Sequence, residues 1–171
     1  MESPAEAEAV TFEYYVATRT AALQRFAYLV TRNPEDARDV VQDALIGLYP
    51  RWREVSARGA VDAYVRRSIV NAQVSRWRRN HRVVTLAEPD VLAQAPVSPD
   101  ASGPVADHDE ALRLCATLPP VQRAAVVLRF YEDRSFAEIA TILGCPEATA
   151  RSHVHRALAA LRARLEGSRE R

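Results

Sequence analysis

Hydrophobic residues recur three and four positions apart over most of the chain, which predicts amphipathic helices rather than strands. The first such pattern covers about residues 12–31, and the second runs from Pro34 to about Tyr49, where Pro50 ends it. Asn33 directly before Pro34 is a start signal, because its side chain can cap free N–H groups at a helix end. The stripe expected to be buried in the second helix is Ala37, Val40, Val41, Ala44, Leu45 and Leu48. We therefore predict an all-α fold.

A third helical pattern covers about residues 60–79, after a short connector at 51–59. Arginines fill its polar positions, and it ends in the run RWRR at 76–79. Arginine next to an aromatic residue is typical of sites that bind single-stranded nucleic acid, because the guanidinium groups contact the phosphate backbone and the aromatic ring stacks on a base. An equally good interpretation is that Trp77 closes the helical core and that the arginines around it are only solvated.

The helical pattern stops between about residues 84 and 107, where four prolines and several small polar residues lie. This composition predicts a flexible linker. It divides the chain into an acidic tail at 1–11, a helical domain at 12–83 and a second domain at 108–166. Because such a linker imposes no fixed orientation, we expect the free protein to be extended in solution.

A helix-turn-helix is predicted between residues 134 and 162. Ser135 and Glu138 form a capping box at the start of its first helix, and Gly144 suits the left-handed residue at its end. Pro146 fits the first position of the second helix. The polar face of that helix carries Arg151, Ser152, His155 and Arg156. These residues suit the major groove of DNA, whereas the alternative is an ordinary helical hairpin with a solvated arginine face.

Two shorter helices are expected before this motif. The first begins at Asp107 or Asp109 and ends near Thr117, and the second opens at Pro119-Pro120. The residues expected to point inward from the second are Val121, Ala125, Leu128 and Tyr131. The inward stripe expected for the last helix of the chain is Ala150, Val154, Leu158, Leu161 and Leu165.

Composition excludes several classes of function. The net charge is +1, but basic and acidic residues are segregated along the chain, and basic clusters attract phosphate even in a nearly neutral protein. Cys115 and Cys145 lie far apart without metal-ligand spacing, so we expect no metal site. No apolar run reaches the ~20 residues that span a bilayer, and no secretory signal is present, so we expect a cytoplasmic protein. Without a catalytic constellation or phosphate-binding glycine loop, we expect no enzyme, no cofactor and no small-molecule substrate.

Three stretches in order resemble one family. They are DARDVVQDALIGLYPRW, AYVRRSIVNAQVSRWRR and LPPVQRAAVVLRFYEDRSFAEIATILGCPEATARSHVHRAL. Together they are similar to the extracytoplasmic-function (ECF, group IV) sigma factors of the sigma-70 family, and within it to the SigE-like subgroup. The resemblance implies two modules, region 2 and region 4, without region 1.1 or a folded region 3. It also implies a function, namely directing core RNA polymerase to promoters and aiding promoter opening.

The resemblance assigns site residues to three surfaces. The residues that would dock on core polymerase are Asp39, Gln42 and Asp43. Those that would open and hold the −10 element are Trp52, Asn71, Arg76, Trp77, Arg78 and Arg79. Those that would read the −35 element are Arg151, Ser152, His155 and Arg156. Ala150, His153 and His155 depart from the residues usual in the family, which leaves the preferred −35 bases open.

The resemblance also implies partners, which are core RNA polymerase, promoter DNA and an anti-sigma factor that clamps both modules. Two other classes of protein compete with it. A helix-turn-helix regulator would bind a palindrome without polymerase, but it does not explain the arginine-rich third helix. A scaffold or enzyme built from two helical bundles is the remaining alternative.

Overall fold

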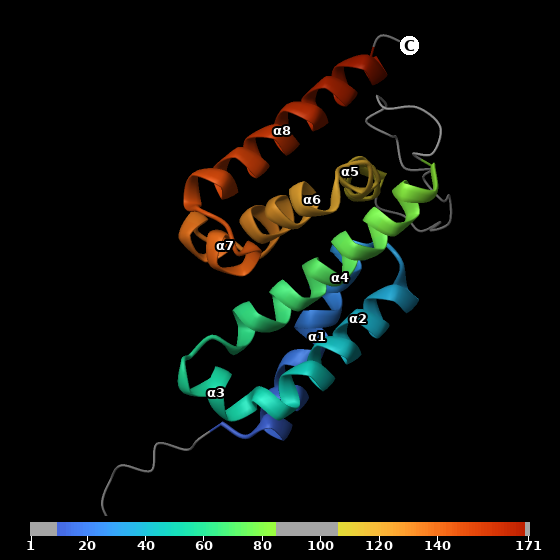
Figure 1. Ribbon diagram of the computed structural model, residues 1–171. Coiled ribbons are helices and arrows are strands. Elements are labelled where there is room, and N and C mark those ends of the chain that lie inside the picture. Colours follow the sequence, from blue (N-terminus) through green and yellow to red (C-terminus); the bar gives the residue numbers. More distant parts are fainter. Residues whose placement is uncertain (1–9, 85–105, 170–171) are drawn as a thin grey trace, which may run out of the picture.

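The computed structural model describes residues 10–84 and 106–169, and this part of the chain is helical without a strand (Figure 1). The N-terminal module consists of α1 (Phe12–Thr31), α2 (Pro34–Leu48), the 3-10 turn η1 (Tyr49–Arg51), α3 (Trp52–Ala57) and α4 (Val61–Val84). The C-terminal module consists of α5 (Ala106–Ala116), α6 (Pro120–Val126), the π-helical turn η2 (Val127–Tyr131), α7 (Phe136–Leu143) and α8 (Glu147–Arg169). The expected tail and linker fall almost entirely outside the described residues.

The predicted start and stop signals form the contacts expected of them. The Asn33 side chain accepts hydrogen bonds from the first free N–H groups of α2, at 2.9 and 3.0 Å. Ser135 and Glu138 make a reciprocal capping box at the start of α7. Gly144 ends that helix with φ +66°, a backbone conformation that residues with a Cβ rarely adopt. Helix ends in this protein are therefore set by local chemistry.

Several details differ from the sequence expectation. The connector at 51–59 is largely helical, and α4 continues five residues beyond the expected end at Arg79. Tyr131, expected to point inward, is 53% exposed, because the π-helical turn before it advances the chain with wider spacing than an α-helix. Leu165 is also exposed, since the packing of α8 against its neighbours ends at Leu161.

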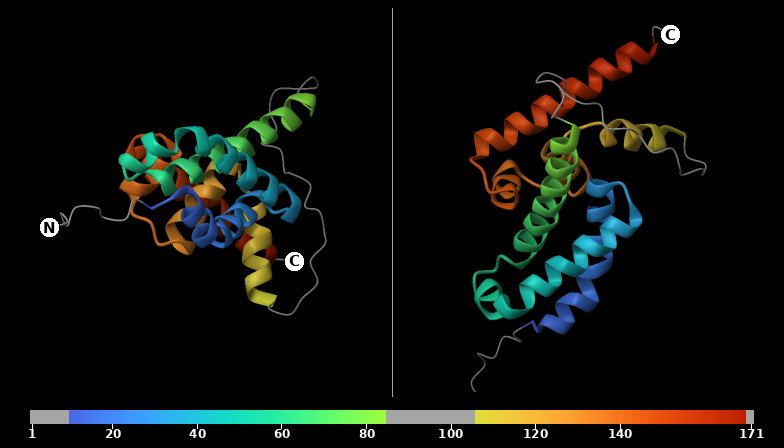
Figure 2. Two further views of the ribbon diagram at one scale, coloured as in Figure 1. Left: turned by 90° about the horizontal axis from the view of Figure 1, so that it is seen from below. Right: turned by 45° about the vertical axis from the view of Figure 1, so that its right-hand side comes forward.

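One hydrophobic core runs through both modules. Leu23, Phe26 and Ile69 of the N-terminal module belong to the same buried cluster as Leu128 and Ile139 of the C-terminal module. Figures 1 and 2 show α4 lying between α1 and α2 on one side and α6 and α7 on the other. This arrangement differs from the expectation of an extended free protein, because α4 buries apolar residues on both of its sides.

Arg123 of α6 supports this contact from within the core. Its guanidinium donates to the carbonyl oxygen of Val30 in α1 at 2.6 Å, 93 positions away in the chain. The other donors reach the carbonyls of Cys115, Ala116 and Leu118, at 2.7–3.1 Å, where α5 ends. Burial lowers the pKa of Arg123 to about 10, so the side chain remains charged at neutral pH. A single buried arginine thus satisfies carbonyls at the ends of two helices in different modules.

Candidate nucleic-acid and partner interfaces

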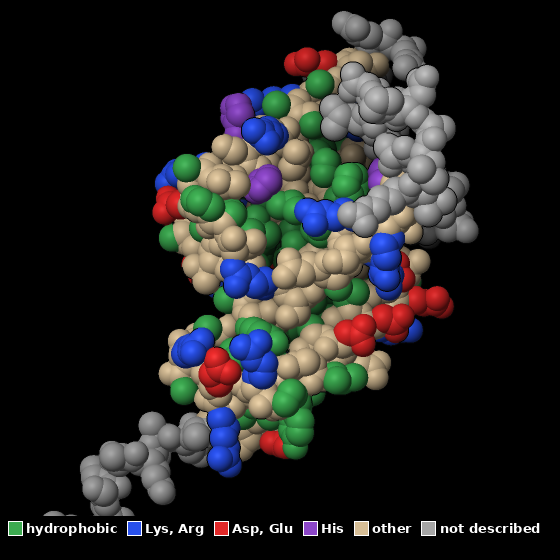
Figure 3. Space-filling view, viewed as in Figure 1, with side chains coloured by type: hydrophobic (Ala, Val, Ile, Leu, Met, Phe, Trp, Pro, Cys, Tyr) green, Lys and Arg blue, Asp and Glu red, His purple; other side chains and the backbone are tan. Residues whose placement is uncertain are grey.

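The predicted recognition helix is α8, and its polar face is exposed. Arg151 is held in place by Glu147 one turn earlier, with a 2.5 Å hydrogen bond, and by the ring of Phe136, whose centre lies 4.4 Å from the guanidinium carbon. Ser152 donates its hydroxyl to the carbonyl of Ala148 at 3.0 Å, which leaves the oxygen free to accept. Figure 3 shows basic and histidine side chains together on this half of the molecule.

His155 and Arg156 follow on the same face, and both are exposed. In the described part of the chain, Arg156 pairs with no carboxylate, so its donors remain available. His153 differs, because it is half-buried and its Nδ1 atom lies inside the protein without a partner. Burial, followed by the charge of Arg156, lowers the pKa of His153, which favours the neutral form of this side chain. The −35 candidates therefore lie on one accessible face, and His153 lies at its edge.

Three of the −10 candidates share an exposed side of α4. Asn71, Arg78 and Arg79 are all exposed, and they follow one another at helical spacing. Ser75 lies between them on the same side and is also exposed, yet the sequence analysis did not select it. Its position four residues after Asn71 was the signal that would have found it. This side of α4 can present hydrogen-bonding and cationic groups to a nucleic-acid strand.

Arg76 and Trp77 are placed differently. Arg76 is half-buried and pairs with Asp36 in the first turn of α2, so part of its charge is neutralised within the module. Trp77 is half-buried as well and stacks on His81, with ring centres 4.1 Å apart. Both side chains are therefore positioned by neighbours before any DNA is bound.

Trp52 in α3 belongs to an aromatic cluster. Its ring lies 5.5 Å from that of Phe12 and 5.6 Å from that of Tyr15, and the side chain is half-buried. These contacts connect α3 to α1 and orient the short segment that precedes α4. The structure does not bring Trp52 onto the face of α4 formed by Asn71, Arg78 and Arg79.

The third candidate surface lies on α2. Asp39, Gln42 and Asp43 are exposed, and Figure 3 shows acidic side chains gathered along this helix. Beside them is a groove of about 520 Å³ between α1 and α2, lined mainly by apolar side chains and including Gln42. Ile46 and Tyr49, each 63% exposed, border the same groove. Sequence analysis missed these two residues because an apolar residue outside the buried stripe carries no signal of its own.

Other kinds of site find little support in residues 10–84 and 106–169. No cluster of three or more histidine, cysteine, aspartate or glutamate side chains there could hold a metal ion. Both Cys115 and Cys145 are half-buried free thiols. None of the described helices is long and apolar enough to cross a membrane.

The protein has two helical modules, and the second carries a helix-turn-helix whose second helix is exposed and cationic. These features define the class of two-module helix-turn-helix proteins. Family models agree with this division: Sigma-70 region 2 matches residues 12–83, and Sigma-70, region 4 matches residues 108–161. The chain belongs to the sigma-70 family, in its ECF group.

Named relatives are similar over most of their length. The RNA polymerase sigma-E factor of Streptomyces avermitilis is 38% identical over 162 residues, which cover 95% of this chain and 89% of the relative. The ECF RNA polymerase sigma factor SigM of Mycobacterium tuberculosis is 36% identical, over 85% of this chain and 71% of the relative. A solved structure with the same fold is that of the sigma factor RpoE in complex with the anti-sigma factor NepR, from Bartonella quintana. It has a TM-score of 0.67 at 24% identity and covers 91% of this chain and 96% of that one.

Proposed function

We propose that this protein is an ECF sigma factor that directs core RNA polymerase to promoters and aids promoter opening. The observation that carries the proposal is the exposed face of α8, formed by Arg151, Ser152, His155 and Arg156, on a chain that also holds a region 2 module. A helix-turn-helix regulator that acts without polymerase does not account for the arginine-rich helix α4 of that module. The chain itself requires no catalytic group, because polymerase supplies the chemistry.

At the −35 element, α8 enters the major groove of the duplex. Contacts to phosphates position the helix, and contacts to base edges provide the sequence preference. Arg156, exposed and without an ion pair in the described chain, is suited to a base edge. Arg151, held by Glu147 and Phe136, is suited to a fixed phosphate contact.

At the −10 element, α4 holds the single strand that is exposed when the duplex melts. Asn71, Arg78 and Arg79 offer donors along one side, while Trp77 presents aromatic surface near the same end of the helix. Bases that leave the stack regain stacking energy on such rings, and cations hold their backbone. Arg76, paired with Asp36, positions this end of α4 against α2.

Core polymerase binds the α2 surface formed by Asp39, Gln42 and Asp43 together with the adjoining groove. An exposed apolar groove bordered by charge is typical of a protein-binding surface, in which apolar contacts supply affinity and charges supply selectivity. A protein that binds core polymerase acts in the cytoplasm, because polymerase transcribes the chromosome there.

An anti-sigma factor is the third partner. The structural neighbour from Bartonella quintana is a sigma factor in complex with such a protein. In the present chain, the α2 surface is acidic and the α4 and α8 surfaces are basic. A protein that covers both must present both signs of charge, which favours a specific partner over a nonspecific contact.

The direct test is co-purification with core RNA polymerase, followed by run-off transcription from a genomic library. We expect the wild-type protein to bind core polymerase and to produce discrete transcripts that core polymerase alone does not make. Binding to a palindromic duplex without any affinity for polymerase would contradict the proposal.

A further inference from the structure

The ring of Phe136, the first residue of α7, has two arginine side chains packed on it. The guanidinium carbon of Arg151 in α8 lies 4.4 Å from the ring centre, and that of Arg129 in η2 lies 5.0 Å from it. A guanidinium group is attracted to the electron-rich face of an aromatic ring. The three side chains come from three elements of the C-terminal module, so this contact connects η2 and α7 to the recognition helix.

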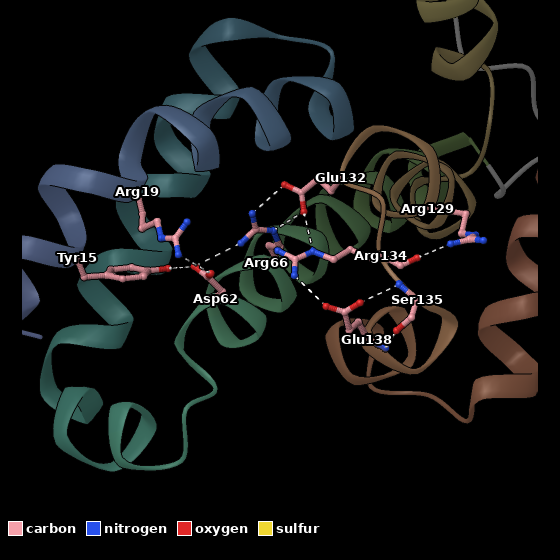
Figure 4. A network of polar contacts seen from close by, with 9 residues as sticks. All are labelled: Tyr15, Arg19, Asp62, Arg66, Arg129, Glu132, Arg134, Ser135 and Glu138. Carbon is pink, nitrogen blue, oxygen red and sulfur yellow. Dashed lines mark hydrogen bonds and ion pairs between the residues drawn. The ribbon is translucent and has the colours of Figure 1, made fainter. Parts of the chain in front are cut away.

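Arg129 is itself held by the backbone that precedes α7. Its Nη1 atom donates to the carbonyl oxygen of Arg134 at 2.9 Å (Figure 4). Arg129 lies in the π-helical turn, and such turns occur frequently at functional sites. Phe130, the next residue of the turn, is 61% exposed, so the turn directs Arg129 toward Phe136 and leaves its neighbour in solvent.

Two carboxylates fix the backbone before α7. Glu132 accepts two hydrogen bonds from Arg66 of α4, at 2.7 and 2.8 Å. The guanidinium of Arg134 lies 3.6 Å from the Glu132 carboxylate and 3.0 Å from that of Glu138, the acid of the capping box. Figure 4 shows these contacts at the start of α7. The carbonyl to which Arg129 donates is therefore held from both directions along the chain.

Arg151 has two contacts within the protein and is still accessible. Its guanidinium donates to Glu147 at 2.5 Å and packs on Phe136, yet the Arg151 side chain remains 58% exposed. Arg156 on the same face pairs with no carboxylate in the described part of the chain. The face of α8 therefore carries one cation in a fixed place and one that is free to adapt to its partner.

We propose that Arg129 and Phe136 are positioning residues, which hold Arg151 in place for a contact with one phosphate of the DNA backbone. This inference rests on the proposed function, because it requires α8 to lie in a duplex. Phosphate contacts fix the register of a recognition helix without reading the sequence. A guanidinium that is ordered before DNA arrives loses less side-chain entropy on binding, so the two positioning residues strengthen the contact.

Nuclear magnetic resonance of the full-length protein tests the positioning without DNA. The ring current of Phe136 should shift the Arg151 side-chain N–H signal, which is identified by its absence in Arg151→Ala. We expect Phe136→Leu to remove this shift, Phe136→Tyr to retain most of it, and Arg129→Met to reduce it. Phe130→Leu, which removes an exposed ring from the same turn, is the control and should leave the signal unchanged. An identical Arg151 signal in the wild type and Phe136→Leu would overturn the positioning.

Affinity for DNA tests what the positioning achieves. The probe is one duplex of fixed sequence at several salt concentrations, because phosphate contacts make binding salt-dependent whatever the sequence. We expect Phe136→Leu to bind it roughly two- to fivefold more weakly, the range of one exposed cation–π contact, and Phe136→Tyr to bind as the wild type does. Arg151→Ala should reduce the slope of log affinity against log salt by about one. When Arg151 is already alanine, Phe136→Leu should have no further effect.

The double variant separates positioning from damage to the fold. A general loss of structure would weaken binding equally with and without Arg151, so equal effects of Phe136→Leu in both backgrounds would overturn the proposal. An unchanged salt slope in Arg151→Ala would overturn the phosphate contact. If Phe136→Leu loses helicity by circular dichroism, Arg129→Met takes its place in the same comparison. If the wild type shows the ring-current shift but binds no duplex, the proposed function fails and the positioning of Arg151 stands.

Discussion

Arginine has two different roles among the individual residues of this chain. Arg66 and Arg123 are buried and join the modules, whereas Arg78 and Arg156 are exposed on α4 and α8. A buried guanidinium that donates to buried carbonyls or to a carboxylate is structural, because moving it would leave those acceptors unpaired. Exposed guanidinium groups retain donors for phosphate or base edges. Burial, rather than residue type, separates the two groups.

Arg156→Ala tests the assignment of α8 to the −35 element. If Arg156 reads a base edge, the variant loses roughly 1–3 kcal/mol of discrimination at one base pair while its affinity for other sequences changes little. Competition binding with promoters altered at single −35 positions measures this. A uniform loss across all sequences would assign Arg156 to a phosphate instead.

Gln42→Arg combined with Asp43→Arg tests the α2 surface. Both side chains are exposed and lie outside the buried stripe, so the double variant should keep its helicity and bind core polymerase more weakly. Glu166→Arg, an equally exposed acid on α8, serves as the control and should bind core polymerase as the wild type does. Equal affinity of the double variant and the wild type would contradict the assignment.

At the scale of single elements, helix ends carry much of the local specificity. The capping box of α7 places Glu138 against the backbone N–H of Ser135 at 2.8 Å and against Arg134 at 3.0 Å. The Ser135 backbone, followed by Arg134 and the Ser135 hydroxyl, lowers the pKa of Glu138 to about 2. The ionised form of this side chain is therefore the one that holds the start of the helix-turn-helix.

This cap predicts how stability depends on pH. Because the pKa of Glu138 is lower in the folded protein than the ~4.3 of a free glutamate, its contribution is present above that pH and is lost as the pH falls toward 2. Glu138→Gln should remove this part of the acid dependence. Chemical denaturation between pH 6 and about pH 2 measures it. If the free energy of unfolding of the variant falls with pH as steeply as that of the wild type, the carboxylate is not held as the structure indicates.

Trp77→Ala tests the role of α4. We expect this variant to bind an isolated −35 duplex as the wild type does, but to open promoters poorly, because the stacking surface near Arg78 and Arg79 is lost. A pre-melted promoter should rescue only part of the defect, since stacking also holds the open strand. An equal defect in −35 duplex binding would contradict the division of labour between α4 and α8.

At the scale of the whole molecule, the shared core couples two modules that the sequence divides. Leu23 and Ile69 belong to the same buried cluster as Leu128 and Ile139. Arg123 adds a polar connection to the last turn of α1 through the carbonyl of Val30. A protein built this way should unfold as one cooperative unit.

Arg123→Met tests this coupling. Methionine fills part of the space but leaves the carbonyls of Val30, Cys115, Ala116 and Leu118 without their donor. Losing several buried hydrogen bonds to one charged group should lower the free energy of unfolding by roughly 3 kcal/mol. Thermal unfolding followed by circular dichroism measures both the loss of stability in the variant and the cooperativity of unfolding. A single transition is expected for the wild type. Two separate transitions in the wild type would mean that the modules are not coupled.

Local patterns and motifs in the amino-acid sequence were enough to predict the helices and the family of this protein. Asn33, the Ser135–Glu138 box and Gly144 act on their immediate neighbours, so their positions predict where helices begin and end. Residues of the α2 stripe such as Val40 and Leu48 are buried as expected, since a period of 3.6 residues marks one face of a helix. The order of three long motifs was specific enough to indicate the sigma-70 family. None of these inferences requires knowing what one helix packs against.

The way the two modules meet depends on contacts between residues far apart in the chain. A helical stripe tells which face is apolar, but it does not tell which distant helix covers that face, so the contact of α4 with α6 and α7 could not be predicted. Nor does an arginine in a sequence show whether water or Glu132 will satisfy it. Arg66 and Arg67 are adjacent in the same basic run, yet one is buried between modules and the other is exposed. The reason is that burial depends on the three-dimensional position of a side chain, and only a long-range contact sets that position.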